Sequence, residues 1–164
     1  MSRPLAADVR IRPATDADVP ALGRLGASLL RLHYAFDMQR FMAPRGNPEE
    51  GYGWFLASQL REAEAVVFVA ERGGAVAGYV YAGLEPHSWK ELREAAGFIH
   101  DVVVEDAHRG AGIASALIDV ASEWLKAHGA PRVMLWTAER NHAAQRLFEQ
   151  AGFRRTMIEM TREL

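Results

Sequence analysis

The stretch of sequence that decides the fold lies past the middle of the chain and reads Val104-Glu105-Asp106-Ala107-His108-Arg109-Gly110-Ala111-Gly112-Ile113-Ala114. The apolar run that ends at Val104 is typical of a buried strand, and apolar residues recur at helical spacing from Ile113 onward. Gly110 and Gly112 stand between them, so the pattern predicts a strand, a glycine turn and a helix in direct succession. Amide groups at such a helix start have no partner inside the helix and suit an anion, although the glycines can also serve the turn alone.

Three nucleotide-binding patterns compete for this stretch. A Walker phosphate loop needs Gly-Lys-Ser/Thr where the chain has Gly112-Ile113-Ala114, so that pattern is excluded. A Rossmann fingerprint needs a third glycine, where the chain has Ser115, and an acidic residue about 20 positions later, where it has Trp136 and Thr137. The Rossmann pattern therefore does not fit either. The pyrophosphate of coenzyme A remains as the anion, and Arg109 would add a positive charge beside it.

Apolar patterns on either side predict the remaining elements. Strands are expected at residues 9–12, 65–71, 75–84, 98–104, 132–137 and 156–160. Helices are expected at residues 15–33, within 48–63, at 113–125 and at 141–151, and a short helix is possible within 85–96. Gly73 and Gly74 between the second and third strands predict an antiparallel hairpin. The order β-α-α-β-β-β-α-β-α-β gives an α/β fold class, an α+β mixed sheet with helices on both faces.

The composition fits a single globular domain over residues 1–164, with 49% apolar and 24% charged residues. The 19 basic and 21 acidic side chains give a formal charge of −2, which disfavours nucleic acid and anionic membrane as partners. Because the chain has no cysteine, disulfides, thiolate zinc sites and cysteine nucleophiles are excluded, and no metal is expected. No apolar run approaches the roughly 18 residues of a membrane span and no signal peptide is evident, so we expect a cytoplasmic protein.

Two segments resemble the signatures of the GNAT superfamily of acyl-CoA-dependent N-acetyltransferases. The first signature is Gln/Arg-x-x-Gly-x-Gly/Ala, and residues 107–112 match it at both glycines and at Arg109 but depart at Ala107. Residues 141–153 resemble the second signature in their Asn, Ala, aromatic and Glu positions and in the closing Gly-Phe. The likeness covers about Val66 to Met160 in element order and is most specific from Phe98 to Phe153.

This resemblance implies a sheet that is splayed between strands 98–104 and 132–137, with the pantetheine arm of acetyl-CoA in the gap. The residues that it implies for cofactor binding are Val102, Val103, Val104, Arg109, Gly110, Ala111, Gly112, Ile113, Ala114, Asn141 and Phe148. Backbone groups of the valines would pair with the arm, and the amides of residues 109–114 would hold the pyrophosphate. Asn141 would lie near the thioester, although it is equally well explained as a plain helix cap.

For catalysis, an acceptor amine must lose a proton to a base whose pKa lies near neutral pH, or to a water leading to one. Many relatives carry Glu or His near the position of His100 and Asp101. Because side chains alternate along a strand, only one of the two can face the gap. His100 shares its side with Val102 and Val104 in a regular strand and is the first candidate; Asp101 is the second, and structural roles stay open for both.

The general acid is a departure from the family pattern. In many relatives a tyrosine protonates the leaving thiolate, and Phe148 stands at the matching position here. The thiolate would leave unassisted or use water, with His142 and Tyr34 as further possible donors.

The acceptor would bind between the first two helices and the loop before the signature strand. Residues there that can form an aromatic pocket with a carboxylate for an ammonium group are Tyr34, Phe36, Asp37 and Trp89, joined by Trp54 and His87. Plain packing roles are the alternative. The predicted function is acetyl transfer from acetyl-CoA to a primary amine of a small molecule or peptide in a ternary complex, or else a non-catalytic acyl-CoA-binding module. A homodimer through the edge segment 155–164 is also expected.

Overall fold

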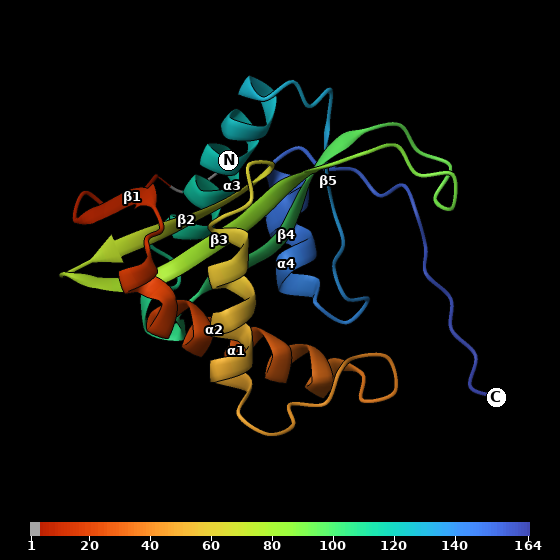
Figure 1. The fold of residues 1–164 in the computed structure, drawn as a ribbon, viewed down its shortest axis with the longest axis horizontal. Helices are drawn as coiled ribbons and strands as arrows, with labels where there is room; N and C mark the ends of the chain where they lie inside the picture. Colours follow the sequence, from red (N-terminus) through yellow and green to blue (C-terminus); the bar gives the residue numbers. More distant parts are fainter. Residues whose placement is uncertain (1–3) are drawn as a thin grey trace.

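A five-stranded sheet forms the centre of the computed structural model, which describes residues 4–164 (Figure 1). The strands lie in the order β1-β2-β3-β4-β5. Their bounds are β1 Val9–Pro13, β2 Ala65–Arg72, β3 Ala75–Glu85, β4 Ala96–Val104 and β5 Val133–Leu135. The first four strands are antiparallel neighbours, and β5 is parallel to β4. The mixed sheet predicted from the sequence is therefore confirmed.

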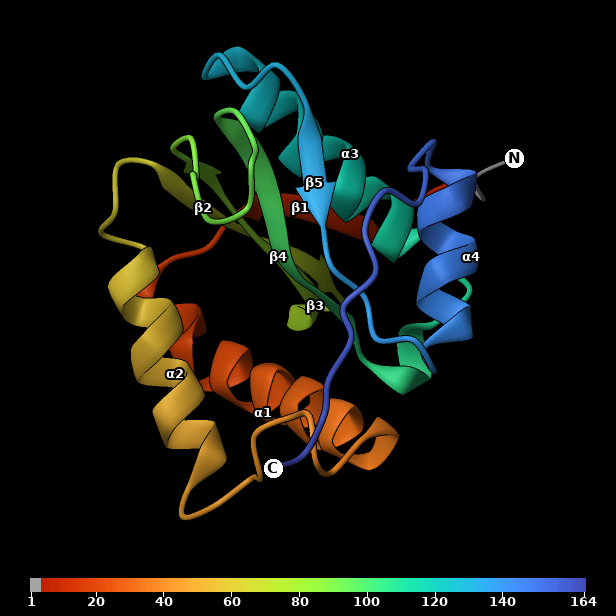
Figure 2. The ribbon, with the colours of Figure 1, turned by 90° about the vertical axis from the view of Figure 1, so that its right-hand side faces the viewer.

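Four helices cover the sheet, two on each face (Figure 2). On one face lie α1 Val19–Phe36 and α2 Pro48–Gln59, and we call this the α1–α2 face. On the other lie α3 Ile113–Ala127 and α4 His142–Gln150, which form the α3–α4 face. Short 3-10 turns, Asp16–Asp18 and Asp106–His108, precede α1 and α3. No helix of residues 4–164 is long and apolar enough to cross a bilayer.

Each face of the sheet has its own apolar core, because side chains alternate along the strands. The buried residues under α1 and α2 are Leu22, Leu25, Leu56, Val67, Val69, Tyr79 and Val103. The buried residues under α3 include Phe68, Val80, Ala82, Ile99, Ile113, Leu117, Ile118 and Leu125. The predicted β2–β3 hairpin is present, and Gly73 and Gly74 take φ values of 60° and 78°, a region that glycine reaches without strain.

Glycines let α1 and α2 approach each other closely. A Cβ placed on Gly23 would lie 2.3 Å from the backbone oxygen of Glu49 in α2. A Cβ on Gly51, within α2 itself, would meet no atom within 4 Å. The two positions therefore separate the effect of helix contact from the effect of helix propensity.

We expect Gly23→Ala to lower the free energy of unfolding by about 1 to 3 kcal/mol, because the added methyl group forces the two helices apart. Gly51→Ala is the control and should raise it by about 0.5 to 1 kcal/mol, since alanine is the better helix former. Urea denaturation of both variants measures the difference. Equal effects of the two substitutions would contradict the close contact.

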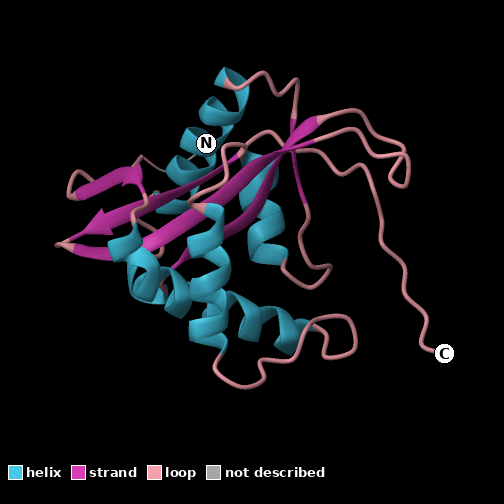
Figure 3. Ribbon diagram, viewed as in Figure 1, coloured by secondary structure: helices cyan, strands magenta, loops and turns pink. Residues whose placement is uncertain are grey.

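Two expectations for secondary structure are wrong. Residues 156–160 do not form a sixth strand; the chain after α4 is extended, and Met157, Ile158 and Met160 are exposed (Figure 3). An ion pair between Arg40 and Glu159 instead joins this segment to the loop after α1. Residues 86–95 do not form a helix either. They continue the β3–β4 hairpin as a loop that is closed by a bridge between Ser88 and Arg93.

Candidate functional site

The sheet opens between β4 and β5. The two strands pair only at Gly97 with Val133, Phe98 with Met134 and Ile99 with Leu135. Beyond Ile99 the β5-facing edge of β4 has no strand partner among residues 4–164, and β4 and the chain that follows β5 run in different directions in Figure 1. We call this gap beside residues 100–104 the β4–β5 opening. It confirms the splayed sheet that the family resemblance implied, and it leaves backbone groups of Val102 to Val104 free to pair with an extended ligand.

A β-bulge in β4 lies where the opening begins. Tyr81 of β3 pairs with Asp101, but the next residue, Ala82, pairs with Ile99, so His100 is an extra residue without a partner. Strict alternation is lost at a bulge, and both His100 and Asp101 contact side chains of the α1–α2 face. The prediction that His100 shares its side with Val102 and Val104 is therefore wrong, because those valines pack on the α3–α4 core.

His100 is held between two aromatic rings. Its ring stacks on Tyr81 at a centroid distance of 4.8 Å and on Phe98 at 5.8 Å. Its Nε2 atom lies 3.2 Å from Oε1 of Glu85, and its side chain is 30% exposed. This contact restrains the imidazole ring while leaving it accessible. Sequence reasoning missed Glu85, because only the β3–β4 register brings that residue near the bulge.

Asp101 is buried on the same face, with 8% of its surface exposed. Its Oδ2 atom accepts hydrogen bonds from Tyr52 of α2 at 2.8 Å and from Tyr79 of β3 at 2.9 Å. Burial raises the pKa of this carboxyl above its usual range, while the two hydroxyl donors lower it. Burial likewise raises the pKa of both tyrosines, so they remain hydrogen-bond donors at neutral pH.

The raised pKa of Asp101 predicts a pH-dependent effect on stability. Ionisation costs more in the folded than in the unfolded chain, so this group's stabilising contribution is present at low pH and is lost as the pH rises through its folded value. The side-chain amide of an Asp101→Asn variant would not ionise and would keep an acceptor oxygen for both tyrosines.

We therefore expect Asp101→Asn to gain free energy of unfolding relative to the original protein as the pH rises from about 4 to 7. The titratable groups that face Asp101 include Tyr52, Tyr79, His33 and His100. A positive charge on either histidine lowers the pKa of Asp101 and so opposes the shift that burial causes. Urea denaturation at several pH values measures it. A difference that stays constant with pH would show that Asp101 has an ordinary pKa.

The loop at the far end of β4 fits an anion. Gly110 and Gly112 take φ values of 79° and 76°, and Gly112 caps α3. Within residues 4–164, no protein acceptor takes a hydrogen bond from the amides of residues 110–115. Six free amides at a helix start form the kind of cradle that binds phosphate. Arg109 lies beside it, but its guanidinium group pairs with Asp106 at 2.7 Å, so part of its charge is already balanced.

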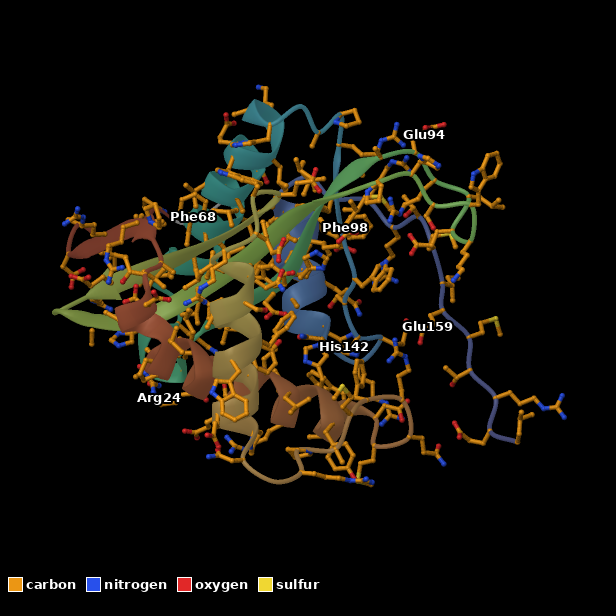
Figure 4. All side chains as sticks on the ribbon, viewed as in Figure 1. Arg24, Phe68, Glu94, Phe98, His142 and Glu159 are labelled. Carbon is orange, nitrogen blue, oxygen red and sulfur yellow. The ribbon has the colours of Figure 1, made fainter. Side chains whose placement is uncertain are left out.

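The second signature places its residues on α4 and its N-terminus. Asn141 caps the helix, since its Oδ1 atom accepts a hydrogen bond from the amide of Ala144 at 3.2 Å. Phe148 is half-buried and packs on the α3–α4 core, with its ring 6.0 Å from that of Phe153. His142 is an exposed first residue of α4 (Figure 4). The capping role of Asn141 is confirmed, and its proposed contact with a thioester stays a prediction.

The residues predicted to bind the acceptor do not form one pocket. Asp37 uses its carboxylate locally, because Oδ1 accepts from the amides of Gln39 and Arg40. Tyr34 and Phe36 lie near the end of α1, whereas Trp89 is 84% exposed on the β3–β4 loop, which projects from the sheet (Figure 4).

Two more of the predicted acceptor residues also lie apart. Trp54 lies on the outer side of α2, beside a surface cavity lined by Val19 and Pro20. The ring of His87 lies 6.4 Å from that of Trp89, on the same projecting loop.

A continuous row of rings on the open part of the α1–α2 face was not predicted. The rings in contact, in order from α2 to β5, are Tyr52, Phe55, Tyr81, His100, Phe98 and Trp136. Phe98 lies where β4 meets β5 (Figure 4). Burial and the negative charges of Asp101, Glu85 and Glu62 raise the pKa of Tyr81 to about 12. The row therefore has a carboxylate, Glu85, beside its His100 ring and a guanidinium group, that of Arg93, 4.8 Å from its Phe98 ring.

Solved structures share this fold. A mutant of the Bacillus halodurans protein BH1408 has a TM-score of 0.79 and 21% identity, and the match covers 94% of this chain and 99% of that one. The aminoglycoside N-acetyltransferase AAC(6')-Iy, solved in complex with CoA, has a TM-score of 0.75 and 16% identity, covering 99% and 98% of the two chains. At these identities the similarity is one of fold.

Sequence relatives point to the same family. The mycothiol acetyltransferase of Thermomonospora curvata is 31% identical over 120 residues, which are 70% of this chain and 38% of that protein. The uncharacterized N-acetyltransferase MJ1207 of Methanocaldococcus jannaschii is 34% identical over 100 residues, 61% of this chain and 44% of that protein. The chain thus spans less than half the length of these curated relatives. A model of the acetyltransferase (GNAT) family matches residues 30–153, and since this is more than half of the chain, the protein belongs to the GNAT family.

Proposed function

We propose that the protein transfers an acetyl group from acetyl-CoA to a primary amine by direct attack in a ternary complex. The observation that carries this proposal is the β4–β5 opening, which begins at His100 and leads to the free amides of residues 110–115. The unpaired edge of β4 thus runs from a side chain that can accept a proton to a site for an anion. Acetyl transfer from a pyrophosphate-bearing thioester needs these two features together.

The residues present fit coenzyme A. Left-handed Gly110 and Gly112 put backbone rather than side chains at the rim of the anion cradle, and the amides of residues 110–115 would hold the pyrophosphate. The unpaired β4 edge at Val102 to Val104 would hold the pantetheine arm as an added strand does. When bound, acetyl-CoA supplies the activated acetyl group, and the protein's part is to position it against the amine.

His100 is proposed as the base. Its Nε2 atom lies 3.2 Å from Oε1 of Glu85, which leaves Nδ1 as the ring atom to accept a proton from the amine. Glu85 orients the ring in the way that a carboxylate orients the histidine of other acyl-transfer sites.

The acceptor is proposed to bind on the open part of the α1–α2 face beside His100. Phe55 and Trp136, at opposite parts of the aromatic row, are both exposed, and Glu85 lies between them on the same face. Exposed rings near a carboxylate suit a protonated amine. Aminoglycosides are positively charged amines. One aminoglycoside acetyltransferase of this fold has been solved in complex with the aminoglycoside sisomicin.

Phe148 supports a second candidate, a non-catalytic acyl-CoA-binding module. Its side chain has no proton to give, and it packs against the apolar core of the α3–α4 face. In the catalytic proposal the thiolate leaves unassisted, which its modest basicity allows.

Release of free thiol from acetyl-CoA with a panel of amines distinguishes the two. Polyamines, amino acids, aminoglycosides and peptides with free N-termini cover the main acceptor classes. Turnover with any of them supports the transferase. Binding of acetyl-CoA without turnover on every amine would favour the module, and absence of binding would overturn both.

A further inference from the structure

We infer that Asp101, Tyr52 and Tyr79 act together as a positioning group that fixes the β4 bulge and, through it, the place of His100. The inference rests on the proposed function. It concerns a buried carboxyl that the proposed proton transfer does not use, and two tyrosines from other elements that converge on one of its oxygens.

The three side chains connect three elements at one atom. Oδ2 of Asp101 in β4 accepts from the hydroxyl of Tyr52 in α2 at 2.8 Å and from that of Tyr79 in β3 at 2.9 Å. Tyr79 is fully buried and Asp101 nearly so. Two donors on one oxygen fix its position more tightly than one, and in a buried site they meet no competition from water. Asp101 therefore ties both its neighbouring strand and a helix to this point of β4.

A bulge is the place where such an anchor is needed. His100 has no partner in the strand ladder, so the ladder does not set the direction of its side chain. Asp101 is the first residue after it that pairs again, opposite Tyr81. Fixing the side chain of Asp101 limits the rotation of the backbone on one side of His100. A shift of about 1 Å in a proton-accepting group can cost roughly 100-fold in rate, so this restraint matters for turnover.

Helix α1 leaves space for the ring of Tyr52, one of the two donors to Asp101. A Cβ on Gly26 would lie 2.1 Å from a ring carbon of Tyr52, so only glycine leaves the space in which that ring lies. The ring thereby passes close to α1 and brings its hydroxyl to Asp101. Docking of α1 and α2, which border the proposed acceptor surface, is thus linked to the bulge.

The chain offers a matched control in Tyr81. Its hydroxyl also joins β3 to α2, donating to Oε1 of Gln59 at 2.8 Å, but it does not touch Asp101. Phenylalanine at position 52, 79 or 81 keeps the ring and removes one interelement hydrogen bond. The substitutions at positions 52 and 79 remove a bond that ends on Asp101, whereas Tyr81→Phe removes one that does not and keeps the ring that stacks on His100.

Asp101→Asn separates positioning from proton transfer. Asparagine keeps an oxygen that can accept from both tyrosines but cannot serve as a base at neutral pH. Asp101→Ala removes the acceptor and leaves two buried hydroxyls without a partner. A positioning role predicts that the asparagine variant is much faster than the alanine variant.

The test is steady-state kinetics with the best amine of the panel. Tyr52→Phe and Tyr79→Phe should each lower kcat roughly 10-fold with the KM for acetyl-CoA unchanged, and Tyr81→Phe should lower it less. Asp101→Asn should keep most of kcat, and Asp101→Ala should lose roughly 100-fold. If Asp101→Ala does not fold, the three phenylalanine variants and Asp101→Asn still test the positioning role.

Two results would overturn the inference alone. One is equal kcat for all three phenylalanine variants, and the other is an Asp101→Asn variant that folds but is as slow as Asp101→Ala or has no turnover, which would make the carboxylate itself the base. Absence of turnover in the unmodified protein with every amine would instead overturn the proposed function, and the inference with it.

Discussion

Replacing His100 by alanine is expected to lower kcat/KM at neutral pH by roughly 100-fold or more. The imidazole is held at the start of the β4–β5 opening by Tyr81, Phe98 and Glu85, and its loss leaves the amine to give its proton to water. The rate should recover in part at higher pH, because more of the amine is then already unprotonated. Kinetics of thiol release between about pH 6 and pH 9 measures both effects.

His128→Ala is the control for this experiment. His128 is exposed after the last turn of α3, where its ring stacks on Trp124 and its Nδ1 atom forms a hydrogen bond with the carbonyl oxygen of Trp124; it lines a surface cavity together with Glu85 but is not among the side chains stacked on His100. The His128→Ala substitution should leave the rate and the pH profile of thiol release unchanged. If His100→Ala kept the full rate and profile as well, His100 would not be the base, and its ring would serve only the packing of β3 against β4.

Replacing Gly112 by valine is expected to abolish the stabilisation of the protein by acetyl-CoA. A ligand at 100 times its Kd stabilises a fold by about 2.7 kcal/mol, which is a readily measured rise in Tm. Valine at a residue with a φ of 76° would put a branched side chain at the helix start and disturb the amides of the cradle. The variant should show little or no rise in Tm with acetyl-CoA.

Gly129→Val supplies the matched control, because Gly129 follows the same helix and has a φ of 87° with no atom within 4 Å of an added Cβ. Both substitutions force valine into a left-handed backbone conformation, so both should lower Tm in the absence of ligand. Only Gly112→Val should lose the response to acetyl-CoA. An unchanged response in Gly112→Val would show that the pyrophosphate binds elsewhere.

Local patterns explain which parts of this structure were predictable. The turn at Gly73 and Gly74, the glycine loop before α3 and the Asn141 cap each depend on a few neighbouring residues, and the structure contains all three. The failed strand at residues 156–160 shows the opposite case, because the segment stays unpaired although β5 is an edge strand, and pairing with a neighbour is not decided by the segment's own residues.

The chemistry at the bulge depends on register, which the sequence alone does not determine. One extra residue in β4 moves His100 to the face of Asp101 and separates it from Val102 and Val104. The same register brings Glu85 to the imidazole. The pair of residues 100 and 101 was therefore found from the sequence, while their orientation and their partners were not.

Crystallography of the complex with acetyl-CoA is the most direct test of the proposed site. We expect pyrophosphate oxygens within hydrogen-bond distance of the amides of residues 110–115, the pantetheine arm alongside Val102 to Val104, and the acetyl group beside His100. Acetyl-CoA bound outside the β4–β5 opening, or with its acetyl group on the far side of the sheet from His100, would contradict the proposal.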